Sequence, residues 1–108
     1  RFFERAEIKH AIAYLRLIAN KNDDSAFLRI VNFPTRGIGS RSLENLQDIS
    51  RKDGCSLWDA SLQSSDQAPA LKKGLPYFIH LIRHIESGFE GLTLPQMIDL
   101  INFFKIYG

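Results

Sequence analysis

Hydrophobic residues recur along the chain at intervals of three and four, which is the spacing of one face of an α-helix. The first such run covers residues 4–21 without Gly or Pro. Its predicted buried stripe consists of Ile8, Ala11, Ile12, Leu15 and Ile18. Similar runs predict further helices near residues 24–31, 40–52, 56–62, 74–86 and 93–104. Because no segment alternates with a period of two, we expect an all-α fold, a compact bundle of about five to six helices.

The segments between these runs contain typical capping and helix-breaking residues. Residues 22–25, Asn-Asp-Asp-Ser, should cap the second helix, and Gly54 should end the third. Ser56 and Thr93 are predicted to cap the starts of the fourth and last helices. Residues 63–70 contain almost no apolar side chains, so we expect a mobile loop there.

The most informative connection is residues 33–41, Phe-Pro-Thr-Arg-Gly-Ile-Gly-Ser-Arg. Pro34 should stop the second helix, because it lacks a backbone donor and disfavours helical backbone at the residue before it. Gly37 and Gly39 can adopt positive φ and let a partner approach the backbone closely. The Ile38 side chain should point back between the flanking helices. The backbone of the turn is therefore predicted to face outward.

The helix that follows this turn would present an anion-binding site at its start. Ser40 is its predicted N-cap, and the helix dipole favours an anion there. Arg36 and Arg41 lie on either side of that point. This order of elements is the layout of a helix-hairpin-helix, which holds a nucleic-acid backbone through loop amides. The alternative is a tight helix-to-helix connection without a ligand, because glycine turns are common between helices.

Composition and charge fit one domain with a polyanionic partner. The chain has 108 residues, 44% of them hydrophobic, which predicts a single domain over residues 1–108 with a modest core. The net charge is only +2, but it is unevenly distributed. Residues 1–52 contain ten Lys/Arg and six Asp/Glu, whereas residues 53–108 contain four and six. The basic half contains the glycine turn, which supports binding to a polyanion.

The sequence gives little support for catalysis or metal binding. His80 and His84 are four residues apart on the fifth predicted helix, but without an HExxH motif or a nearby Cys we interpret them as surface or half-buried residues. The single cysteine, Cys55, excludes an internal disulfide and fits a reducing, intracellular setting. No run approaches the roughly 18 apolar residues of a membrane span. Because no G-x-x-x-x-G-K-[ST] motif occurs, we expect this chain to bind no nucleotide or other cofactor.

Three stretches near the start resemble a known family. Residues 1–9, 13–20 and 22–24 are similar to the beginning of the 2B subdomain in UvrD/Rep/PcrA-type superfamily 1 DNA helicases. Residues 34–39, Pro-Thr-Arg-Gly-Ile-Gly, match the GIG element of the same family at the same distance downstream. The resemblance is strong to about residue 46 and more diffuse beyond it.

The resemblance implies that the parent protein is an ATP-dependent 3′-to-5′ DNA helicase of the bacterial cytoplasm, with a role such as DNA repair. ATP and Mg²⁺ would bind between its 1A and 2A subdomains, outside this chain. The all-helical 2B subdomain would hold duplex DNA by its phosphate backbone without base specificity, restrain unwinding, and contact subdomain 2A and regulatory proteins. The implied DNA contacts, named here the GIG turn, are Thr35, Arg36, Gly37, Ile38, Gly39, Ser40, Arg41 and Ser42.

Two positions depart from the family pattern. Phe33 stands where a small polar residue is usual, and His10 stands where Asp is common, which puts any salt bridge at that site in doubt. We also expect the chain to be a piece of a longer protein. Its last helix would then expose Phe103, Phe104 or Tyr107 and promote self-association.

Two functional hypotheses remain open. In the first, the chain is a duplex-DNA-binding and regulatory module whose binding is weak and sensitive to salt. In the second, it is a protein-interaction or hinge module in which the GIG turn is only structural. Neutralising roughly two to three phosphates would give the first a log–log salt slope of about −2 to −3.

Overall fold

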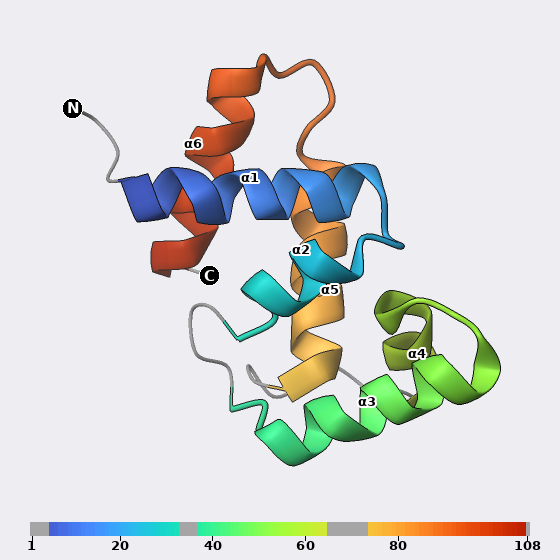
Figure 1. Ribbon diagram of the computed structural model, residues 1–108. Coiled ribbons are helices and arrows are strands. Elements are labelled where there is room, and N and C mark those ends of the chain that lie inside the picture. The colour runs from blue at the N-terminus through green and yellow to red at the C-terminus, as the bar shows by residue number, and fades with distance from the viewer. Residues whose placement is uncertain (1–4, 33–36, 65–73, 108) are drawn as a thin grey trace.

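The computed structural model describes residues 5–32, 37–64 and 74–107, and these residues form six α-helices and no strand (Figure 1). The helices are α1 (Arg5–Ala19), α2 (Asp24–Ile30), α3 (Ser40–Asp53), α4 (Leu57–Ser64), α5 (Gly74–Ser87) and α6 (Leu94–Tyr107). The predicted all-α fold is confirmed.

The core lies where α1 crosses α2, α5 and α6. In Figure 1, α5 runs through the middle of the molecule, with α6 near one end and α3 near the other. Tyr14, Phe27 and Phe78 are the largest of the side chains that have no exposed surface. The rings of Phe27 and Phe78 meet edge to face, with centroids 5.4 Å apart, which joins α2 to α5.

The predicted buried stripe of α1 is confirmed at Ala11 and Ile18, which are buried, and is wrong at Ile8 and Ile12. Tyr14 and Leu17 have no exposed surface, whereas Ile8 and Ile12 are 37% and 44% exposed. The difference arises because α1 packs against three helices, so its buried arc is set by their positions and is centred on Tyr14. Burial of an aromatic ring of this size contributes more than burial of either isoleucine.

The predicted caps are confirmed for three helices. The Asp23 carboxylate accepts a hydrogen bond of 3.0 Å from an amide in the first turn of α2, and the Ser56 hydroxyl accepts one of 3.1 Å at the start of α4. Thr93 and Gln96 form a reciprocal capping box on α6. Gly54, with φ of 65°, ends α3 in the left-handed conformation that glycine favours.

The predicted loop over residues 63–70 begins too early. Helix α4 continues through Ser64, so residues 63 and 64 are helical. The remainder of that prediction lies outside the described residues.

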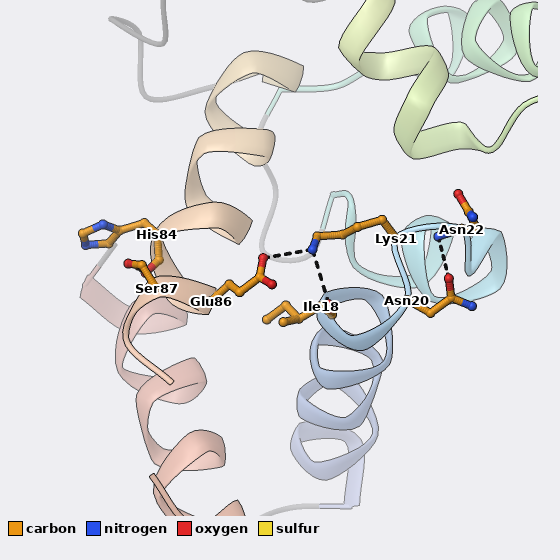
Figure 2. Close-up of polar contacts among 7 residues, drawn as sticks. All are labelled: Ile18, Asn20, Lys21, Asn22, His84, Glu86 and Ser87. Carbon is orange, nitrogen blue, oxygen red and sulfur yellow. Dashed lines mark hydrogen bonds and ion pairs between the residues drawn. The ribbon is translucent and has the colours of Figure 1, made fainter. Parts of the chain in front are cut away.

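Lys21 connects three helices beyond the end of α1. Its Nζ donates to the Ile18 carbonyl at 3.3 Å and to Glu86 Oε1 of α5 at 2.9 Å (Figure 2). The same amine lies 5.6 Å from the centroid of the Trp58 ring, which is buried in α4. An ion pair and a cation–π contact thus converge on one side chain.

The outer surface of α6 is partly as expected. Phe103 is 52% exposed and Leu94 is 59% exposed. Phe104 is instead half-buried and meets the ring of His84 edge to face, at 5.2 Å between centroids. The side chain of Tyr107 lies outside the described residues.

Candidate nucleic-acid interface

The described part of the GIG turn begins at Gly37, and Thr35 and Arg36 lie outside it. Gly37 has φ of 75°, as predicted. Gly39 has φ of −83° and ψ of 169°, so it does not use the positive φ that glycine permits. One left-handed residue is enough to reverse the chain here, and Gly39 then enters α3 in an extended conformation. A Cβ atom at Gly39 would meet nothing within 4 Å, so the absence of a side chain leaves open space beside the turn.

Ile38 holds the turn from inside, as predicted. Its side chain is only 4% exposed. The Asn32 side-chain amide donates a hydrogen bond of 2.5 Å to the Ile38 carbonyl. This bond fixes the backbone between the two glycines against the end of α2.

The start of α3 differs from the prediction by one residue. Gly39 is the N-cap, and Ser40 is the first helical residue, so the predicted Ser40 cap is wrong. The extended conformation of Gly39 lets its carbonyl accept the first hydrogen bond of the helix, 3.2 Å from the Leu43 amide. Ser40, Arg41 and Ser42 are exposed. Their amides precede that first bond, so they have no acceptor within the helix.

No side chain caps α3, and its first turn contains no acidic residue. Of the helices whose preceding residues are described, α2, α4 and α6 have a side-chain cap, and α3 alone has none. Arg41 adds a positive charge in the first turn, where the helix dipole already disfavours a cation. The site brings together free amides, two hydroxyls and a guanidinium, which are donors for an anion.

The remaining titratable candidates are His80, His84 and Cys55, and the structure describes all three. His80 and His84 are exposed and stack at 6.2 Å between ring centroids. Among the described residues, no group of three or more His, Cys, Asp and Glu side chains could hold a metal ion. Burial, and then the charge of Asp53, raise the pKa of the Cys55 thiol, which disfavours the nucleophilic thiolate. No helix in the described part of the chain is long and apolar enough to cross a bilayer.

A second surface feature was missed by the sequence analysis. A groove of about 220 Å³ lies between α1 and α2. We name it the α1–α2 groove, and its principal lining residues are Lys9, Ile12, Ala13, Arg16, Ala26 and Arg29. The α1 residues Lys9, Ile12, Ala13 and Arg16 have the spacing of one helix face, but Ile12 was assigned to the buried stripe.

Comparison with known proteins identifies the family. Residues 1–102 match the model of the UvrD-like helicase C-terminal domain. The chain belongs to this family. The match extends well beyond residue 46, so the second half of the UvrD-like chain carries more family signal than its sequence pattern suggested.

Relatives of this UvrD-like chain are bacterial DNA helicases. It is 52% identical over 104 residues to DNA helicase II of Escherichia coli (strain K12), which covers 94% of the chain and 14% of the relative. It is 47% identical over 107 residues to ATP-dependent DNA helicase Rep of Buchnera aphidicola, covering 96% and 16%. It is 36% identical over 102 residues to ATP-dependent DNA helicase PcrA of Staphylococcus aureus (strain Mu50), covering 92% and 14%. The chain therefore spans only a small part of the length of these relatives.

Proposed function

We propose that this chain is the duplex-DNA-binding and regulatory module of an ATP-dependent 3′-to-5′ DNA helicase, corresponding to its 2B subdomain. It grips the phosphate backbone through the GIG turn. The observation that carries the proposal is the uncapped start of α3, with free amides, no acid and an exposed Arg41. Family membership supports the helicase assignment.

The proposed grip uses charge and backbone donors. A phosphate oxygen accepts hydrogen bonds from the amides of Ser40 and Arg41, and the helix dipole stabilises its charge. The hydroxyls of Ser40 and Ser42 supply further donors, and the open space at Gly39 admits the phosphate close to the backbone. These contacts hold the backbone and carry no base information. Thr35 and Arg36 are included among the proposed DNA contacts only because the sequence resembles the helicase family.

The proposal leaves the chemistry to the rest of the parent protein. ATP and Mg²⁺ act between the 1A and 2A subdomains, and this chain contributes no catalytic residue. Its partners are duplex DNA, subdomain 2A and regulatory proteins.

A protein-interaction or hinge module is the second candidate. It is favoured by the buried Ile38 side chain and by the bond from Asn32 to the Ile38 carbonyl, which give the GIG turn a structural role without DNA. The two candidates differ in whether the amides at the start of α3 respond to duplex DNA.

A titration of the ¹⁵N-labelled chain with a short duplex at low salt tests the proposal. We expect shifts concentrated at residues 37–42 that fade as salt rises, with a dissociation constant near the 10⁻⁴ M end of non-specific binding. Ser40→Asp places a carboxylate beside the free amides and should abolish these shifts. Asn45→Asp is the matched control, because it makes the same charge change farther along α3 at an exposed position. If the amides of wild-type residues 37–42 do not respond to millimolar duplex, the structural candidate takes its place.

A further inference from the structure

The α1–α2 groove combines an apolar floor with a basic rim. Ile12, Ala13 and Ala26 form the floor, and Ile12 remains 44% exposed. Lys9 and Arg29 lie on the rim, from α1 and α2 respectively. Ile8, 37% exposed, lies one turn before Ile12 on the same face of α1 and extends the apolar surface.

The charge of the groove is unbalanced. No acidic residue with a described side chain lines it. Arg16 donates from Nε to Asp23 at 3.2 Å, and its side chain remains 62% exposed. Among the described residues, Lys9 and Arg29 form no ion pair. The groove is therefore complementary to a ligand with several carboxylates.

The size of the groove narrows the class of ligand. Its volume of about 220 Å³ is below the roughly 300–1,000 Å³ of pockets that enclose small ligands. It has room for one or two side chains of a larger partner. Lys9 and Arg16 lie two helical turns apart, about 10 Å along α1, so the cations are spread along a segment and do not converge on one point.

The apolar floor of the groove favours a protein partner over a nucleic acid. A phosphate backbone would pair with the cations but would leave Ile12 and Ile8 exposed to water. An amphipathic helix with acidic and aliphatic residues would satisfy both features, because helices dock in grooves through aliphatic side chains at intervals of three and four. We propose that the α1–α2 groove docks an acidic, amphipathic helix of a partner protein, whose carboxylates pair with Lys9 and Arg29 and whose aliphatic side chain covers Ile12.

This surface is distinct from the GIG turn. The groove is formed by α1 and α2, whereas the proposed phosphate site lies at the start of α3 (Figure 1). The proposal therefore holds or fails independently of DNA binding.

The test uses a fluorescein-labelled helical peptide of roughly four turns, with glutamates flanking two leucines on one face. We expect it to bind the wild-type chain with a dissociation constant of about 0.1 mM or tighter at low salt. Arg29→Glu should weaken binding about tenfold and Ile12→Ser about fivefold. Arg83→Glu is the matched control, because Arg83 is exposed on α5 and outside the groove, and it should change binding by less than about twofold.

Charge reversal distinguishes direct pairing from a fold defect. A peptide with lysine in place of the glutamates should bind the Arg29→Glu variant better than it binds wild type. Equal binding of a peptide with serine in place of the leucines would overturn the proposal, because the floor would then be unused. Absence of peptide binding would overturn it as well. Displacement of the peptide by short duplex DNA, with Ile12→Ser having no effect, would reassign the groove as a phosphate surface.

Discussion

Gly37 and Gly39 lie two residues apart but are glycine for different reasons. Gly37 reverses the chain at φ of 75°, a conformation that side chains with a Cβ atom disfavour. Gly39 has an ordinary extended backbone with open space around it. The fold therefore requires glycine only at the first position, and under the proposed function the open space at the second would admit a phosphate.

Alanine substitutions at the two positions should separate stability from binding. Gly37→Ala should destabilise the chain by about 1–2 kcal/mol, because it forces a non-glycine residue into the left-handed region. Gly39→Ala should cost no more than about 1 kcal/mol, since alanine is only a poorer N-cap. It should nevertheless weaken duplex binding, because its methyl group occupies the space left for the phosphate. Thermal melts and the duplex titration measure the two effects. Equal duplex affinity of Gly39→Ala and wild type would exclude close approach at this position.

His10 should make stability depend on pH. Burial lowers the pKa of His10 below its usual 6.5, and the charges of Lys105 and Arg29 lower it further. The folded chain therefore disfavours the protonated ring relative to the unfolded chain. The stability associated with neutral His10 is fully present above about pH 6.5 and is lost as the pH falls toward the lower folded pKa.

His10→Gln removes the titrating ring. Its melting temperature should therefore fall less than that of wild type between about pH 7.5 and about pH 5.5. His80→Gln is the control, because His80 lies exposed on α5. If the melting temperatures of His10→Gln and wild type fall equally over this pH range, His10 is not the cause of the pH dependence.

At the scale of helices, the boundaries were largely predictable, whereas the buried face of α1 was predicted only in part. Caps such as Asp23 and Ser56 act within three residues of sequence, so their spacing alone identifies them. The start of α3 was misplaced by one residue, because Ser40 and the extended Gly39 compete for the same cap position. The buried face of α1 depends on where α2, α5 and α6 lie, and the local pattern does not contain that information. The α1–α2 groove was missed for the same reason.

The contacts of Lys21 give the connection between α1 and α5 a measurable energy. Lys21→Met keeps the aliphatic stem and removes the charge, so it should cost about 1 kcal/mol at low salt. A double-mutant cycle with Glu86→Gln should give a coupling of about 0.5 kcal/mol that shrinks as salt rises. The Arg51–Asp48 pair within α3 is the control, because its side chains are 73% and 67% exposed and its coupling should be smaller. A larger coupling for the control pair would contradict the role of partial burial.

At the scale of the whole molecule, the uneven charge predicts how duplex binding responds to salt. Lys9, Arg16 and Arg29 line the α1–α2 groove and Arg41 is exposed at the start of α3, whereas Arg51 lies in the last turn of that helix. The all-α fold could be inferred from the hydrophobic spacing along the whole chain, and the family from short stretches within residues 1–39. The path of a duplex across the surface could not, because it depends on which cations share one face after folding.

Substitution of the two exposed arginines of α3 should test that path. Arg41→Gln should reduce the log–log salt slope of duplex binding by about one, from a wild-type value of about −2 to −3. Arg51→Gln should leave the slope unchanged, because Arg51 lies ten residues farther along α3, about 15 Å away. Fluorescence anisotropy at several salt concentrations measures the slopes. Equal reductions for both variants would indicate diffuse attraction by the whole molecule and no localised grip.

The placement of α3 has a consequence for motion. Among the described helices, α3 makes its close backbone contacts with α4 alone, whereas α1 packs against three neighbours. Segments with few tertiary contacts open most readily in the native state, so the amides of α3 should exchange with solvent hydrogen sooner than those of α1. A phosphate bound at the start of α3 would supply the cap that the sequence omits and would slow that exchange. Duplex binding would then make the start of α3 more rigid, without any change in the shape of the molecule.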